Sequence, residues 1–176
     1  MLQSCFDIRN SSFELDSRIR ASSFGLLLTA MRTLAIDLGT RRVGLALSDA
    51  DAKLASPYDV LTITTPQQAL AAVLEVIEAE AVERIVVGVP LNMDDSVGPQ
   101  ARQAVEWGRE LHYRTSLPLI LVDERLSSFA AEQQLIERKR SGEKLTRGRK
   151  KKQLDAMAAA AFLQQFLDGT LPPLNL

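Results

Sequence analysis

Carboxylate side chains occur at three places in this sequence where they follow or interrupt apolar residues. At such places a carboxylate does not stabilise the fold, so a functional role is expected. Asp37 follows the apolar run "LAI", and Asp123 and Glu124 follow the apolar run "LILV". Asp155 belongs to the segment "KKQLDAMAAAAFLQQFL", in which alanines and a phenylalanine follow it at helical spacing. A carboxylate on a packed surface is costly unless it is paired, hydrogen-bonded or bound to a metal. These positions are therefore the candidates for chemistry.

The residue types indicate which chemistry. The chain has one histidine, His112, and one cysteine, Cys5, so carboxylates and basic residues must carry any catalysis. Three carboxylates form an oxygen-rich site that suits Mg²⁺ or Mn²⁺. Two such ions can stabilise the attacking and leaving oxygens of a phosphodiester displacement and lower the pKa of the attacking water. The set predicts a metal-dependent phosphodiesterase.

Each carboxylate also has a purely structural interpretation, which is an ion pair with an arginine or a lysine. For Asp155 the candidate partner is Lys151, one helical turn earlier. Asp123 is either a ligand or the partner that orients Arg125, and the second interpretation is favoured.

A basic segment lies directly before Asp155. The sequence "RKRSGEKLTRGRKKK", residues 138–152, holds nine basic residues and one acidic residue. Such a run is either a solvated, disordered stretch or a binding surface for phosphates, which gives affinity with little sequence choice and steep salt dependence. We expect nucleic acid to contact this segment and the turn after Asp37, through Arg147, Arg149, Lys150, Lys151, Lys152, Arg41 and Arg42.

Composition limits the class of protein. The 176 residues suffice for one core, and the net charge of -1 names no partner. A single cysteine excludes a disulfide framework and suits the reducing cytoplasm. The apolar run at residues 24–30 is far shorter than the roughly 20 residues that cross a bilayer, so no membrane association is expected.

The elements that must position these residues follow from hydrophobic periodicity. Residues 33–37 and 43–48 predict a hairpin, and the second strand alternates large and small side chains. A third strand is expected at residues 53–64, broken near Pro57, and Thr65 is expected to cap the helix that follows. Further elements are expected at 84–89 (strand), 99–113 (helix), 118–123 (strand), from Ser127 or Ser128 to 139 (helix) and 151–167 (helix).

This order predicts an α/β domain at residues 31–170, with a mixed five-stranded sheet and helices on both faces. Residues 1–30 are expected to be a poorly ordered N-terminal extension, with an N-terminal helix as the alternative, and residues 171–176 a C-terminal tail. In open α/β sheets, ligands gather beyond the carboxyl ends of the parallel strands. If the first and last strands are parallel neighbours, the carboxylates at their ends share one edge of the sheet.

Four stretches in order resemble the YqgF family: "IDLGTRRVGLALSD", "IVVGVPLNMDDSVGPQA", "VDERLSS" and the basic segment leading into "LDAMAAAAFLQQFL". Members are bacterial ribonuclease-H-like proteins, described provisionally as Holliday junction resolvases and as pre-16S rRNA nucleases. The resemblance implies a ribonuclease-H-like fold and a metal-dependent nuclease, with an acidic triad at Asp37, Glu124 and Asp155.

The resemblance also covers the loop after residue 89. Gly88, Pro90, Asn92 and Ser96 match the family loop, and the family commonly has glycine where this chain has Asp95. Asn92, with Arg125 of the "VDERLSS" motif, is therefore expected to bind nucleic acid. For Gly88 and Pro90, simple strand-end and turn geometry is the favoured explanation.

The resulting hypothesis is an endonuclease that uses two Mg²⁺ or Mn²⁺ ions and matures the 5′ end of the 16S rRNA precursor. The alternatives are a Holliday junction resolvase and a non-catalytic nucleic-acid or ribosome-binding module. The Asp-x-Gly-Thr turn also resembles the phosphate loop of actin-like ATPases and sugar kinases, but those proteins need two such domains. Expected partners are structured RNA, within ribosomal precursor particles, or branched DNA, with the protein a monomer or a homodimer. No motif distinguishes RNA from DNA, because none shows contacts to a 2′-hydroxyl.

Overall fold

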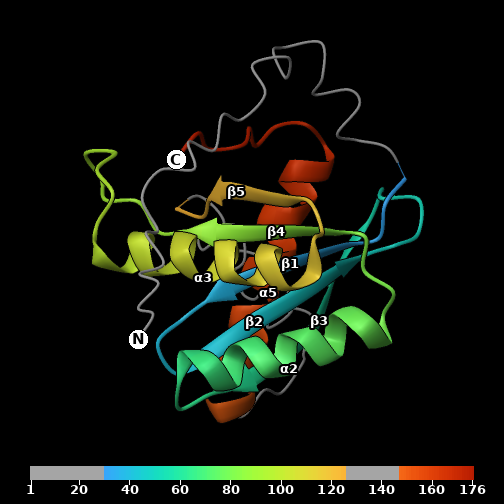
Figure 1. The fold of residues 1–176 in the computed structure, drawn as a ribbon, viewed down its shortest axis with the longest axis horizontal. Helices are drawn as coiled ribbons and strands as arrows, with labels where there is room; N and C mark the ends of the chain where they lie inside the picture. The colour runs from blue at the N-terminus through green and yellow to red at the C-terminus, as the bar shows by residue number, and fades with distance from the viewer. Residues whose placement is uncertain (1–29, 126–146) are drawn as a thin grey trace, which may run out of the picture.

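A computed structural model describes residues 30–125 and 147–176, with side chains described from Leu154 onward in the last helix. As predicted, the strands form one five-stranded sheet with helices on both faces (Figure 1). The order of the strands in the sheet is β3-β2-β1-β4-β5. The elements are β1 (Thr33–Leu38), β2 (Arg42–Ser48), β3 (Ala55–Thr62), α2 (Pro66–Ala79), β4 (Arg84–Val89), α3 (Pro99–Thr115), β5 (Leu119–Asp123) and α5 (Arg147–Leu167).

The first three strands form an antiparallel meander. β1 pairs with β2, and β2 pairs with β3. Leu45 lies opposite Asp59 and Ala46 lies opposite Pro57, so Tyr58 is an extra residue in the ladder. The break predicted near Pro57 is therefore a β-bulge, a place where a strand tolerates a residue without a backbone N–H.

The order of the parallel strands differs from the arrangement considered in the sequence analysis, in which the first and last strands are neighbours. β1 and β5 are parallel, but they are not neighbours, because β4 lies between them and pairs with both. The carboxyl ends of all three parallel strands still point to the same edge of the sheet. That edge carries the predicted site residues of β1 and β5.

The alternation of large and small residues in β2 decides which helix covers which face. Val43, Leu45 and Leu47 pack in the cluster that includes the buried residues of α2 and α3. Ala46 packs instead with α5, which contributes two alanines, two leucines and the two phenylalanines Phe162 and Phe166 to this cluster. Figure 1 shows α2 and α3 on the near side of the sheet and α5 on the far side.

The helix boundaries agree closely with the sequence. α2 begins after Thr65, whose hydroxyl accepts the backbone N–H of Gln68 at 3.2 Å, as predicted for an N-cap. α5 begins at Arg147, four residues before the predicted start. The predictions for residues 1–29 and for a helix between Ser127 or Ser128 and 139 lie outside the described residues. In the described part of the chain, no helix has the length and apolar character needed to cross a bilayer.

Candidate active site

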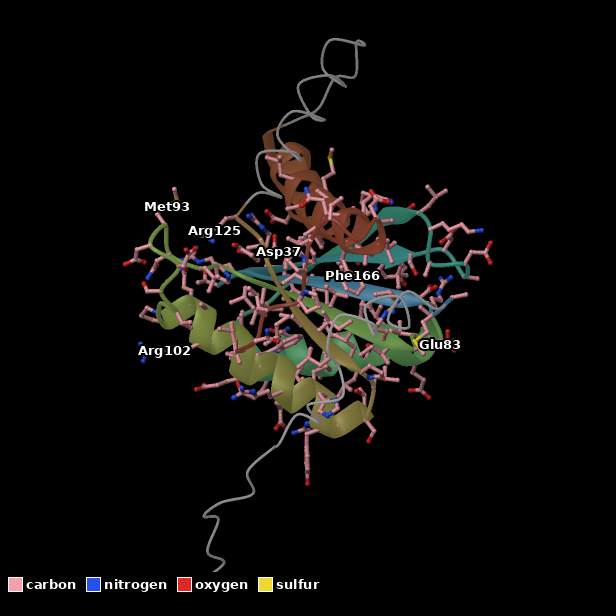
Figure 2. All side chains as sticks on the ribbon, turned by 90° about the horizontal axis from the view of Figure 1, so that it is seen from above. Asp37, Glu83, Met93, Arg102, Arg125 and Phe166 are labelled. Atoms are coloured by element: carbon pink, nitrogen blue, oxygen red, sulfur yellow. The ribbon has the colours of Figure 1, made fainter. Side chains whose placement is uncertain are left out.

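Asp37 lies near the end of β1, on the face of the sheet that α5 covers. It sits opposite Gly44 in the β1–β2 ladder and shares its face with Ala35, which packs on α5. Figure 2 shows Asp37 where the sheet meets α5, with Arg125 toward one end of the molecule and Glu83 at the other end. The small residues of this face leave room for a carboxylate between the strand and the helix.

Glu124 follows β5 directly, and its side chain turns back over β4. A Cβ atom at Gly88 would lie 2.6 Å from Glu124 Oε2 and 3.0 Å from the Phe162 ring. Only glycine at this position lets the carboxylate and the ring lie so close to the strand. The structure thus gives Gly88 a packing role beyond simple strand-end geometry, which was the favoured sequence interpretation.

Asp155 is brought to the same edge by α5. Its backbone carbonyl oxygen would lie 2.3 Å from a Cβ at Gly44, so the helix rests directly on β2 beside the Asp37–Gly44 pair. Its side chain forms an ion pair with Arg42 Nε, and both side chains are 26% exposed. The ion-pair interpretation of Asp155 is therefore realised through Arg42, while the side chain of Lys151 lies outside the described part.

The electrostatics connect the three carboxylates. The pKa of Glu124 is raised to about 8, chiefly by burial and in addition by the charges of Asp37 and Asp123. The pKa of Asp37 is raised to about 6, chiefly by burial and in addition by the charge of Asp155, while the charge of Arg42 opposes the rise. Asp37 therefore interacts with both of the other acids.

The types of the donor atoms fit a divalent cation, whereas the spacing of the side chains does not. The donors are all carboxylate oxygens, and a buried, mutually repelling pair such as Asp37 and Glu124 is stabilised by a positive ion. In the ranges 30–125 and 147–176, however, no three acidic, histidine or cysteine side chains are grouped closely enough to hold an ion as they stand. The third candidate ligand, Asp155, is held by Arg42.

A pocket of about 220 Å³ opens beside Asp37 and Glu124, toward the first turns of α2 and α3. None of the lysines or arginines of the described chain lines it. Most of the residues that line the pocket were not predicted from the sequence as site residues. The stretch "VGPQA", which belongs to a motif quoted above, contains the start of α3 at this edge. The lining residues are Asp37, Leu38, Gly39, Thr40, Ile63, Pro66, Pro90, Gln100, Gln103 and Glu124.

Arg125, which we expected to bind nucleic acid, is engaged within the protein. Its guanidinium donates to Asp123 Oδ2 at 2.8 and 2.6 Å, to Asp95 Oδ1 at 2.7 Å and to the carbonyl oxygen of Asn92 at 2.8 Å. Asp123 thus orients Arg125, as favoured from the sequence. The contacts tie the β4–α3 loop to the end of β5, directly beside Glu124.

The same loop explains two other sequence observations. Asp95 has a φ of 64°, a left-handed conformation that glycine adopts more readily, in agreement with the glycine common in the family. Asn92 Nδ2 donates to Ser96 Oγ at 2.8 Å, so the amide shapes the loop from within.

The remaining basic candidates belong to two elements, the turn after β1 and the start of α5. Arg41 is exposed in the turn between β1 and β2, and its carbonyl oxygen accepts the N–H of Ile63 at 3.0 Å. The backbone of α5 places its first residues one to two turns before Asp155. Their side chains lie outside the described part: Arg147, Arg149, Lys150, Lys151 and Lys152.

The mixed sheet of this order, with helices on both faces, has the ribonuclease-H-like fold, and the protein is a nuclease of this class. The fold is similar to that of a solved RuvC from T. thermophilus in complex with a Holliday junction substrate. The TM-score is 0.54 at 18% sequence identity, and the alignment covers 82% of this chain and 99% of that one.

The chain belongs to the RuvX family, the YqgF group named above: the family model, described as Holliday junction resolvase, matches residues 31–169. Three relatives carry the provisional name pre-16S rRNA nuclease. One from Maridesulfovibrio salexigens is 44% identical over 78% of this chain and 98% of its own length. One from an Anaeromyxobacter species is 45% identical over 79% and 98%. One from Caldanaerobacter subterraneus is 35% identical over 79% and 97%.

Proposed function

We propose that this protein is a divalent-metal-dependent endonuclease that matures the 5′ end of the 16S rRNA precursor. The observation that carries the proposal is the buried, mutually repelling pair Asp37 and Glu124 beside Asp155, at the carboxyl edge of the parallel strands. The names of the relatives that align over their whole length favour RNA as the substrate. The cytoplasm, where bacterial ribosomal RNA is made, belongs to the same proposal.

Asp37, Glu124 and Asp155 are the residues that would hold Mg²⁺ or Mn²⁺, with two ions expected. When bound, the ions supply a water of lowered pKa and stabilise charge on the leaving oxygen. The chain contributes fixed carboxylates: β1 holds Asp37, the Gly88 surface receives Glu124, and α5 brings Asp155 against Gly44. No histidine base is required.

The neighbouring pocket suits an uncharged part of the nucleotide. Its polar side chains, apart from the two acids, are the neutral Thr40, Gln100 and Gln103, and prolines and aliphatic residues form other walls. A phosphate would meet no positive side chain of the described residues there. The pocket therefore accepts a ribose or a base next to the scissile bond, while Arg41 and the basic start of α5 bind flanking phosphates.

A second candidate function is resolution of branched DNA, favoured by the description of the family model. Two paired incisions at a four-way junction need two active sites, so this function requires a symmetric dimer. The third candidate, a binding module of ribosomal precursor particles without catalysis, shares the basic surface and predicts binding that is independent of Asp37.

One experiment separates the three candidates. Purified protein is incubated with Mn²⁺ and, side by side, with 16S rRNA precursor in precursor particles and with a four-way DNA junction. Cleavage at the 5′ end of the precursor supports the proposal. Symmetric cutting of the junction alone would replace it with resolvase activity, and binding of either substrate without cleavage would leave the binding module.

A further inference from the structure

Arg42 occupies a position that the proposed metal site needs. Its Nε donates to Asp155 Oδ2, and its charge opposes the rise in the pKa of Asp37. The positive charge of Arg42 thus partly compensates the negative charges of Asp155 and Asp37. A guanidinium held against a carboxylate repels a divalent cation that approaches the same carboxylate.

The surroundings of Arg42 allow its side chain to move while its backbone stays in place. The backbone is fixed on both sides, because Arg42 pairs with Thr62 in the β2–β3 ladder and its carbonyl oxygen accepts the N–H of Gly39 at 2.9 Å. The side chain is 26% exposed, so rotation about its own bonds suffices to carry the guanidinium from Asp155 to the solvent edge. Asp155 itself is held by the contact of its carbonyl group with Gly44.

We propose that Arg42 is an exchangeable counter-ion: it pairs with Asp155 when no divalent cation is bound, and a bound cation frees it to contact a substrate phosphate. The inference rests on the proposed metal-dependent function. It assigns Arg42 two alternating partners, a carboxylate and a phosphate, within the reach of one side chain.

This exchange makes the binding of cation and of nucleic acid mutually reinforcing. A cation that takes Asp155 liberates a phosphate-binding group, and a phosphate that takes Arg42 liberates a ligand for the cation. By linkage, each must raise the affinity for the other by the same factor. Removing Arg42 is therefore expected to strengthen cation binding in the free protein and to weaken this mutual effect.

The first test measures Mn²⁺ binding to the chelator-treated, full-length protein by isothermal titration calorimetry without nucleic acid. Arg42→Gln is expected to raise the Mn²⁺ affinity by about fivefold or more. The matched control is Arg41→Gln, which removes the neighbouring exposed charge and is expected to change the affinity by less than about twofold, since Arg41 pairs with no carboxylate of the described residues. In an Asp155→Asn background, the gain from Arg42→Gln is expected to be smaller than in the wild-type background, because only the influence of Arg42 on Asp37 remains.

The second test measures the affinity for a fluorescent RNA hairpin by anisotropy, in EDTA and in CaCl₂. The gain in affinity on adding Ca²⁺ is expected to be smaller in Arg42→Gln than in the wild type and in Arg41→Gln. Circular dichroism on each variant verifies that the fold is retained.

The outcomes distinguish the inference from the function on which it rests. Equal or weaker Mn²⁺ binding by Arg42→Gln, with clear binding by the wild type, overturns the exchange and leaves the metal-dependent function intact. An equal gain in Arg41→Gln also overturns it, because the effect is then one of general charge. Failure of every variant to bind Mn²⁺ overturns both.

Discussion

At the scale of single residues, the site is defined by acids whose ionisation the protein opposes. Burial is the largest cause of the raised pKa values of Asp37 and Glu124, and neighbouring carboxylates add to it. Fixed acids that repel each other reduce the stability of the metal-free fold and favour the binding of cations. Function is here in conflict with stability.

This conflict predicts how stability changes with pH. A carboxyl group whose pKa is higher in the folded than in the unfolded chain lowers the free energy of unfolding as the pH rises from about 4 to about 8. We therefore expect Asp37→Asn and Glu124→Gln each to raise the free energy of unfolding in EDTA at pH 8 by about 1–2 kcal/mol, and by less at pH 5. Urea unfolding at the two pH values measures the difference.

Asp51→Asn serves as the control, because the Asp51 side chain is 70% exposed and pairs only at 3.5 Å with the exposed Lys53. Its stability is expected to follow that of the wild type at both pH values. Loss of stability in Asp37→Asn or Glu124→Gln at pH 8 would contradict the repulsion described here.

Residue types and spacing revealed part of this site. Breaks in apolar patterns pointed to Asp37, to Asp155 and to the pair Asp123 and Glu124, and the family resemblance assigned Glu124 to the triad. The pairing of Asp123 with Arg125 is a contact between residues two apart. The Arg42–Asp155 pair was not predicted, because 113 positions separate the two residues and only the packing of α5 on β2 brings them together. Gln100 and Gln103, which line the pocket, were not predicted either, because polar residues on a helix show no pattern that marks a pocket.

At the scale of elements, the contact between α5 and β2 fixes the position of Asp155. A methyl group at Gly44 would meet the backbone of the helix at 2.3 Å, and backbone cannot rotate away as a side chain can. We expect Gly44→Ala to lower the free energy of unfolding by about 1–3 kcal/mol. Cleavage is expected to fall with it, because the helix that carries Asp155 must shift.

Gly108→Ala is the matched control. A Cβ at Gly108 would lie 3.4 Å from Val87 and 3.5 Å from Leu119, which are ordinary contacts, and α3 gains up to about 1 kcal/mol from alanine in its interior. Chemical denaturation should give Gly44→Ala a lower free energy of unfolding than the wild type, and Gly108→Ala an equal or higher one. Equal stability of Gly44→Ala and the wild type would contradict the close packing of α5.

The elements themselves were largely predictable. A period of two in β2 predicted the strand and its two faces, one of large and one of small residues, and Thr65 with Pro66 predicted the start of α2. The insertion of β4 between β1 and β5 was not readable in the sequence, because strand order depends on crossover connections between strands far apart in the chain.

At the scale of the whole molecule, charge is distributed unevenly although the net charge is -1. The basic residues before Asp155 are expected to hold a polyanion against an acidic edge that would otherwise repel it. Replacing Lys150, Lys151 and Lys152 by glutamine should weaken RNA binding. It should also reduce the slope of log Kd against log salt by about 2–3, or 0.7–0.9 for each lost phosphate contact.

Fluorescence anisotropy between 50 and 300 mM KCl, taken as a rough working range, measures this slope. Arg114→Gln is the control, since Arg114 lies in the last turn of α3 and pairs with Glu110 at 2.7 Å. An unchanged slope in the lysine variant would mean that the phosphates bind elsewhere on the surface.

The central claim is that the acids at the carboxyl edge of the sheet perform metal-dependent cleavage, and Asp37→Asn tests it most directly. Cleavage of labelled 16S rRNA precursor in Mn²⁺ and the Kd for the same RNA are measured on one preparation, beside the wild type with and without excess EDTA. We predict a loss of cleavage of at least about 100-fold in Asp37→Asn and in EDTA, with the Kd of the variant within about threefold of the wild type. Cleavage by Asp37→Asn at the wild-type rate, or undiminished cleavage in EDTA, would contradict the claim.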